Sequence, residues 1–257
     1  MNIQKLFDLS GKCAVIVGGA GKIGLPLTEA LGEAGASVVI ASRNKHEETL
    51  ETFKNKGIKI HFVEMDQADE GMVLQGLDCV SRHIKTPDIL INCGVERPMQ
   101  GFFEDSFEKW DLSMRANARG LFLTCRAFAK SMAATGGGSI INVASIYGLV
   151  APDPALYEGT NIETEPDYPY TKGGMIMFSK YLAARFAKNN VRVNVIAPGG
   201  FYNNQPEPFL SQYCKKVPLG RMAVHDDLKG VAVFLASPAS SYITGAVIPV
   251  DGGFSVI

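Results

Sequence analysis

Short apolar runs alternate with longer, partly polar segments through the first half of the chain, and this alternation restricts the fold more than any other feature. Strands are predicted at the apolar runs Lys12–Val17, Ser37–Ala41, Ile58–Glu64 and Asp88–Asn92. Helices are predicted between them at Ile23–Ala34, Lys45–Lys56 and from an N-cap at Asp69 to about His83. Because strands that alternate with helices form parallel βαβ units, the sequence predicts an α/β fold with a doubly wound parallel sheet.

The second half continues the alternation of strands and helices, with longer helices. An apolar run at Ile140–Val143 predicts a further strand, and the runs Val191–Ala197 and Gly245–Asp251 predict the last two. Helices are predicted at Phe107–Ala133 and from Asp167 to about Asn189. Neither a linker nor an internal repeat interrupts the pattern, so residues 1–257 are expected to form a single domain.

Composition and charge exclude several classes of partner. The formal net charge is −1, so no basic field is present to attract nucleic acid or an anionic membrane. The four histidines show no metal-ligand spacing, and no metal site is predicted. The five cysteines are scattered without a C-x-x-C pair, which favours reduced thiols in the cytoplasm. No signal peptide and no run of membrane-spanning length is apparent, so a cytoplasmic protein that binds a small molecule is expected.

A glycine-rich turn follows the first predicted strand and opens the first predicted helix. It reads Gly18-Gly-Ala-Gly-Lys-Ile-Gly24. Glycines at this point let the backbone approach a pyrophosphate, which then lies at the positive end of the helix. This placement between strand and helix predicts a dinucleotide site. The contacts expected from the turn are those of Gly18, Gly21, Lys22, Ile23 and Gly24.

The end of the second predicted strand bears on which dinucleotide is bound. An acidic residue there would bind the adenosine ribose of NAD, but the chain has Ser42 followed by Arg43. Arg43 and Lys22 can accommodate a 2′-phosphate, so NADP(H) is predicted as the preferred cofactor, with NAD(H) possible; alternatively, both are solvated surface charges. Asp66, after the third strand, is either an acceptor for the adenine amino group or an ordinary loop acid.

Three residues further along form a candidate acid–base device. Ser145 follows the predicted strand at Ile140–Val143, and Tyr168 and Lys172 lie one turn apart on a predicted helix. A lysine ammonium favours the phenolate form and is expected to lower the pKa of Tyr168. A tyrosine tuned in this way can act as a general acid or base near neutral pH, and the Ser145 hydroxyl can hold the reacting oxygen.

Taken together, these motifs resemble the short-chain dehydrogenase/reductase family along essentially the whole chain. The resemblance rests on the glycine turn, Asn92, Asn117, Ser145, Tyr168-x-x-x-Lys172, Pro198-Gly199 and the tail Val250-Asp-Gly-Gly253. It implies a Rossmann-type fold, hydride transfer between a nicotinamide and a carbonyl or alcohol carbon, and a homotetramer or dimer.

The resemblance also implies roles for individual residues. Tyr168 is the proton donor in reduction, Lys172 supports it and contacts the nicotinamide ribose, and Ser145 polarises the substrate carbonyl. Asn117 anchors a water that links Lys172 to solvent. Further cofactor contacts are implied for Asn92, Pro198, Gly199, Tyr168 and Lys172.

The chain departs from the family pattern between Ser145 and Tyr168, where the gap is longer than usual. The extra chain near 150–166 either overhangs the substrate pocket or forms a surface loop. The motif Ile146-Tyr-Gly148 … Tyr157-Glu-Gly-Thr160 resembles that of a subgroup of the family. The members of this subgroup belong to bacterial surface-sugar and nonulosonate pathways or are related to gluconate dehydrogenases.

Substrate contacts are predicted on the pocket rim. The candidates are Arg97, Tyr147, Tyr157, Tyr202 and Asn203. Aromatic and hydrogen-bonding groups together suit a polyhydroxylated ligand, so the predicted function is an NADP(H)-preferring oxidoreductase for a sugar, sugar acid or polyol. Arg97 is expected either to bind an anionic group of the substrate or to form an ion pair with Glu96. The alternatives are a cofactor-binding regulator without activity and an epimerase-like enzyme that retains its NAD(P).

Overall fold

The structure is a computed structural model that describes residues 2–257, and its centre is one parallel sheet. The strands are β1 (Cys13–Val17), β2 (Ser37–Ser42), β3 (Ile60–Glu64), β4 (Ile89–Asn92), β5 (Gly138–Val143), β6 (Val191–Pro198) and β7 (Val247–Val250). Within the described residues they form a seven-stranded sheet in the order β3-β2-β1-β4-β5-β6-β7. The predicted doubly wound α/β fold is therefore confirmed.

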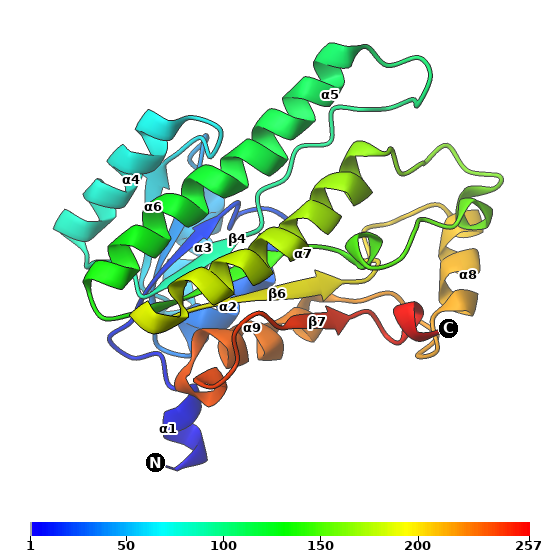
Figure 1. Cartoon of the computed structure of the whole chain (residues 1–257). Helices are drawn as coiled ribbons and strands as arrows, with labels where there is room; N and C mark the ends of the chain where they lie inside the picture. Colours follow the sequence, from blue (N-terminus) through cyan, green and yellow to red (C-terminus); the bar gives the residue numbers. More distant parts are fainter. Residues whose placement is uncertain (1) are drawn as a thin grey trace.

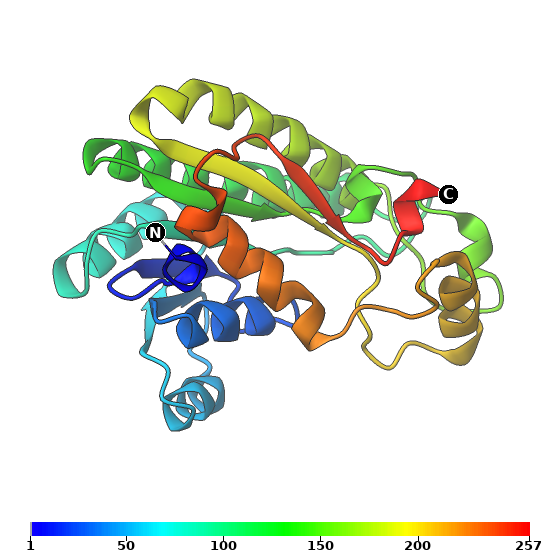
Figure 2. The ribbon, with the colours of Figure 1, turned by 90° about the horizontal axis from the view of Figure 1, so that it is seen from below.

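Helices cover both faces of the sheet. They are α1 (Ile3–Phe7), α2 (Gly24–Glu33), α3 (Glu47–Asn55), α4 (Glu70–His83), α5 (Phe107–Ser113), α6 (Gly120–Ala134), α7 (Asp167–Phe186), α8 (Glu207–Lys216) and α9 (Lys229–Ala236). Figure 2 shows α6 and α7 on one side of the sheet and α2 and α9 on the other. Asp69 caps α4 as predicted, because its side chain accepts a hydrogen bond from the amide of Met72 at 2.9 Å.

The side chains of each strand point alternately to the two faces of the sheet and pack into two separate cores. Val15 and Val17 of β1 pack with α4, α6 and α7, whereas Ala14 and Ile16 pack with α2, α3 and α9. All the strand residues of β1 and β4 are buried, as expected for parallel strands covered on both faces. None of the helices in residues 2–257 is long and apolar enough to cross a membrane.

The long helical segment predicted at Phe107–Ala133 is not one uninterrupted α-helix. Helix α5 ends at Ser113, a π-helical turn covers Met114–Arg119, and α6 then continues to Ala134. The π-helical turn brings no break in composition, so no local pattern indicates it. Asn117 lies within this turn, and such turns frequently occur at functional sites.

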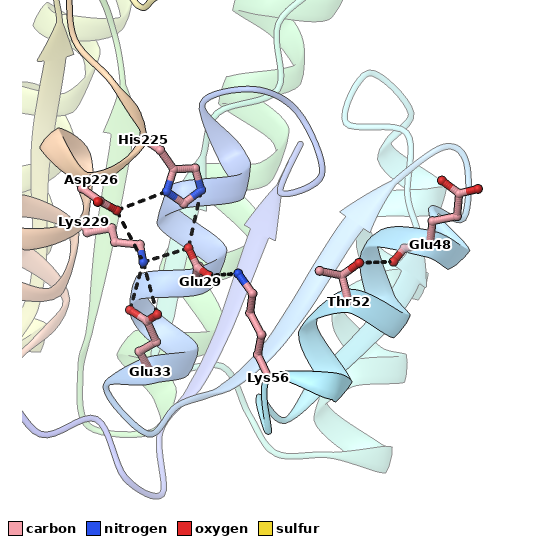
Figure 3. A network of polar contacts seen from close by, with 8 residues as sticks. All are labelled: Glu29, Glu33, Glu48, Thr52, Lys56, His225, Asp226 and Lys229. Carbon is pink, nitrogen blue, oxygen red and sulfur yellow. Dashed lines mark hydrogen bonds and ion pairs between the residues drawn. The ribbon is translucent and has the colours of Figure 1, made fainter.

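A buried carboxylate fastens the helices on one face of the sheet (Figure 3). Glu29 of α2 is only 6% exposed, and it pairs with Lys229 of α9 at 2.8 Å and with Lys56 at the end of α3. Burial favours the protonated acid, but the hydrogen bonds and charges of the two lysines outweigh it and lower the pKa of Glu29 to about 2. The ionised network holds α2 in place beneath the glycine turn.

The order of the strands fixes where a ligand can bind. The chain leaves β1 toward β2 on one side and returns to β4 on the other, and Val17 and Asn92 are register partners at the carboxyl ends. In open α/β sheets this reversal point is where ligands bind. In Figure 1 the arrowheads of β6 and β7 point toward the same end, where α8 lies.

Candidate active site

Two cavities open at the carboxyl ends of the strands. The smaller has a volume of about 590 Å³ and lies over the ends of β1, β2 and β4. The larger has a volume of about 970 Å³ and lies between β5, β6 and α8. Ile23, Cys93 and Val95 line both, so the two form a continuous groove.

The smaller cavity brings together most of the predicted dinucleotide contacts. Its lining includes Gly18, Gly21, Lys22, Ile23, Gly24, Ser42, Arg43 and Asp66. The Ser42 hydroxyl donates to the carbonyl of Asn44 at 2.7 Å, and Asp66 accepts from the amide of Ala68 at 2.8 Å. Asp66 is thus both a loop-capping acid and part of the cavity wall, so the two readings of this residue are compatible.

The turn leaves no room for a side chain at Gly18 or Gly24. Gly18 has a φ of +76°, and a Cβ there would lie 2.7 Å from the Cα of Gly94. A Cβ on Gly24 would lie 2.1 Å from the carbonyl oxygen of Gly18. Thr28 braces the turn by donating to the carbonyl of Gly19 at 2.9 Å. A bare backbone at the start of α2, beside two cations, fits the pyrophosphate of a dinucleotide.

The larger cavity holds the predicted acid–base residues. Ser145, at the end of β5, and Tyr168 and Lys172, on α7, line it together with Pro198 and Gly199. Ser145 is placed by a short turn, in which its hydroxyl accepts from the amide of Tyr147 at 3.1 Å. The arrangement puts two hydroxyls and one ammonium group on one wall of the cavity.

The pKa of Tyr168 differs from expectation. Burial raises it above its ordinary value, and a hydrogen bond with Ser145 and the charge of Arg97 oppose this rise. The predicted lowering of this pKa by Lys172 is not found, because the ammonium donates to the carbonyl of Val143 at 2.7 Å and lies 5.6 Å from the ring centroid. Burial also lowers the pKa of Lys172 itself to about 8.

Two predicted asparagines lie behind the groove. Asn117 is buried, and its side chain donates to the carbonyl of Glu96 at 2.7 Å and accepts from the amide of Glu96 at 2.9 Å. Asn92 lines neither cavity, contrary to the expected cofactor contact, because its amide turns into the sheet and donates to Asn142 at 2.8 Å. Asn92 therefore braces β4 against β5.

The segment 150–166 lies at the mouth of the larger cavity. Residues 160–165 and Tyr157 line it, and the hydroxyl of Tyr157 forms hydrogen bonds with those of Tyr147, at 2.7 Å, and Thr164, at 2.6 Å. Tyr157 also packs on Phe209 of α8, with ring centroids 5.4 Å apart. The overhang expected for this segment is thus the arrangement found.

The other rim predictions had mixed outcomes. The guanidinium of Arg97 lies 4.6 Å from the centroid of the Tyr168 ring and lines the larger cavity. Its suggested pairing with Glu96 is not found, because Glu96 pairs with Arg43 at 2.6 Å. Tyr202 and Asn203 do not line the cavity, since the chain turns outward at this point and leaves Tyr202 largely exposed.

Some residues that line the cavities or brace their walls were not singled out from the sequence. They are Thr28, Gln67 and Thr164. Gln67 lines the smaller cavity and donates to the carbonyl of Ala116 at 2.9 Å. Each makes a contact with a segment distant along the chain or in a loop, and no local pattern distinguishes such residues. The position of Gln67 beside Asp66 was the one usable signal.

Comparisons with known proteins agree with this geometry. Residues 18–255 match a family model described as enoyl-(acyl carrier protein) reductase. Gluconate 5-dehydrogenase of Gluconobacter oxydans is 33% identical over 270 residues, which cover 100% of this chain and 99% of that protein. The chain belongs to the short-chain dehydrogenase/reductase family. As a member of this family, it is an NAD(P)-dependent oxidoreductase.

Solved structures of other short-chain dehydrogenases/reductases share the whole fold. A gluconate 5-dehydrogenase from Burkholderia cenocepacia in complex with NADP and tartrate is 32% identical, with a TM-score of 0.88 and 100% of both chains covered. A short chain dehydrogenase from Leptospira borgpetersenii with bound NAD⁺ is 31% identical, with a TM-score of 0.89 over 99% of this chain and 96% of that one. Structures of this family thus hold either dinucleotide.

Proposed function

We propose that this short-chain dehydrogenase/reductase prefers NADP(H) and interconverts a carbonyl and a hydroxyl group on a sugar acid or a related polyhydroxylated substrate. The observation that carries the substrate class is the position of Arg97 above the Tyr168 ring. No ion pair within residues 2–257 occupies this guanidinium, and it lies against the ring that carries the reacting hydroxyl. A cation there suits a substrate that carries a carboxylate.

The rest of the larger cavity supports a polyhydroxylated substrate. The hydroxyls of Tyr147, Tyr157 and Thr164 are linked by hydrogen bonds, and the two tyrosines add aromatic rings to the wall. Such a wall fits the hydroxyl groups and apolar carbon face of a sugar better than it fits an acyl chain. Gluconate 5-dehydrogenases among the relatives act on a substrate of this kind by name.

The preference for NADP(H) rests on charge in the smaller cavity. Lys22 and Arg43 both line it, and the end of β2 carries no acid. A 2′-phosphate is stabilised by such cations, whereas NAD-binding sites use an acidic residue there. The NADP-bound gluconate 5-dehydrogenase of Burkholderia cenocepacia is consistent with this choice.

Each side chain then has a defined task. The bound nicotinamide supplies or accepts the hydride. Ser145 donates a hydrogen bond to the substrate carbonyl oxygen, and Tyr168 gives that oxygen its proton in reduction or removes it in oxidation. Lys172, whose ammonium is held by the carbonyl of Val143 on the same cavity wall, is assigned the contact with the nicotinamide ribose. Asn117 holds the chain at Glu96 so that the groove keeps its shape.

The substrate assignment predicts a charge-selective effect of one variant. In Arg97→Gln, the KM for gluconate is expected to rise about 10- to 100-fold, because a charge-assisted hydrogen bond contributes about 1.5–3 kcal/mol. The KM for a polyol of the same length, sorbitol, is expected to stay within about twofold. Steady-state kinetics with both substrates measure the two values.

A matched control separates this effect from a general loss of charge. Arg119 is exposed and lines neither cavity, so Arg119→Gln is expected to change neither KM. Equal increases in KM for the acid and the polyol in Arg97→Gln would contradict the assignment of a carboxylate to Arg97.

We also propose that the protein assembles as a homo-oligomer, in keeping with the resemblance to its family. Apolar side chains on the outer faces of α6 and α7 support this, because Phe122, Met177 and Tyr181 are exposed although they are large. Phe178 packs between Phe122 and Tyr181, which makes the patch continuous.

A further inference from the structure

An ion pair crosses the smaller cavity from one strand end to another. Arg43 directly follows β2, and Glu96 follows β4, which lies on the far side of β1. The guanidinium and the carboxylate are 2.6 Å apart, and both residues line the cavity. The pair therefore lies across the end of the groove at which an adenosine ribose would bind.

The backbone of Glu96 is held firmly by hydrogen bonds, whereas the Arg43 side chain is free to move. The backbone of Glu96 is held at both its amide and its carbonyl by the side chain of Asn117. Asn117 is held in turn by the hydroxyl of Ser113, to which it donates at 3.0 Å. The Arg43 side chain is 60% exposed and carries no other ion pair within residues 2–257, so it can turn away from Glu96.

We infer that Glu96 reduces the preference of this enzyme for NADP(H), by competing with the 2′-phosphate of NADP(H) for Arg43. The inference rests on the proposed function. Glu96, after β4, takes the place of the acidic residue that is missing at the end of β2. When a phosphate engages Arg43, the Glu96 carboxylate loses its partner and lies close to a second anion, which is unfavourable. An unphosphorylated ribose imposes no such cost, and its 2′-hydroxyl can donate to the carboxylate.

The other acid in the cavity wall does not have this position. Asp66 accepts from the amide of Ala68 and forms no ion pair with Arg43. Lys22 and Arg115 also line the cavity, so the phosphate keeps cationic neighbours while Glu96 opposes it. The result is a site that accepts NADP(H) with less discrimination against NAD(H) than its cations alone would give.

The test is the ratio of dissociation constants for NADPH and NADH, measured by isothermal titration calorimetry on the intact protein. Glu96→Gln keeps the size of the side chain and removes its charge. It is expected to tighten NADPH about fivefold and to weaken NADH about twofold, which shifts the ratio about tenfold toward NADPH. The shift is expected to shrink at high salt, since the groups are partly exposed.

Two further variants make the outcome specific. Glu70→Gln breaks an ion pair of similar exposure with Arg126 outside the cavity, and it should leave the ratio unchanged. In an Arg43→Gln background, Glu96→Gln is expected to have a smaller effect on NADPH, because the part that comes from competition for the guanidinium is gone.

The outcomes separate this inference from the proposed function. A ratio within about twofold of the wild type in Glu96→Gln, with NADPH still bound, would overturn the role of Glu96 alone. An undiminished Glu96→Gln effect in the Arg43→Gln background would also overturn it. Failure of the wild-type protein to bind either dinucleotide would overturn the proposed function instead.

Discussion

Tyr168→Phe is expected to lower kcat by about 10³-fold while leaving the dissociation constant for NADPH within about twofold of the wild type. The Tyr168 phenol forms a hydrogen bond with Ser145 and lines the larger cavity with it, and the substitution leaves the ring and its packing in place. Pre-steady-state and steady-state assays with a turned-over substrate, together with calorimetry for NADPH, measure the two effects.

The neighbouring tyrosine of the same helix provides the control. Tyr170 is 64% exposed, lies two residues along α7 and does not line the cavity. Tyr170→Phe should retain kcat within about twofold. Near-normal turnover in Tyr168→Phe would remove Tyr168 as the acid–base group, and NADPH binding without turnover in the wild type would favour a regulator.

Gly24→Ala is expected to weaken NADPH binding about 100-fold or more and to lower the free energy of unfolding by about 1–3 kcal/mol. The new methyl group would lie 2.1 Å from the carbonyl oxygen of Gly18, and backbone on both sides prevents an easy shift. The turn must therefore open, which moves the amides that would face the pyrophosphate. Calorimetry with NADPH and chemical denaturation measure the binding and the stability.

An open glycine in another helix is the matched control. Gly230 of α9 has no atom within 4 Å of an added Cβ, and it is remote from both cavities. Gly230→Ala should bind NADPH normally and stabilise the protein by about 0.5–1 kcal/mol, since alanine favours the helix. If Gly24→Ala bound NADPH as tightly as the wild type, the glycine turn would not be the pyrophosphate site.

The sheet could be predicted because its determinants are local. Most strands are short segments rich in apolar residues, and the ends predicted for β1, β2, β4 and β6 lie within a residue of those found. The alternation with helices then fixes the parallel topology. The π-helical turn at Met114–Arg119 could not be predicted, since it adds no break in composition.

The site was predictable where motifs sit at strand ends, and not where distant segments meet. Ser145, Tyr168 and Lys172 share a cavity because the end of β5 and the beginning of α7 lie at the same edge of the sheet. The Arg43–Glu96 pair joins residues from different strands, so no spacing reveals it. Likewise, the pKa of Tyr168 is raised by burial, and this rise is opposed by Ser145 and Arg97, which lie in other segments of the chain.

The most direct test of the proposed reaction is transfer of label from NADPH deuterated at nicotinamide C4 to a panel of keto sugar acids, ketoses and other sugars. The expected result is deuterium on the newly formed carbinol carbon of a keto sugar acid, with the signal absent in Tyr168→Phe. NADPH binding without label transfer to any member of the panel would contradict the proposed function, and label found only on non-acidic sugars would contradict the role given to Arg97.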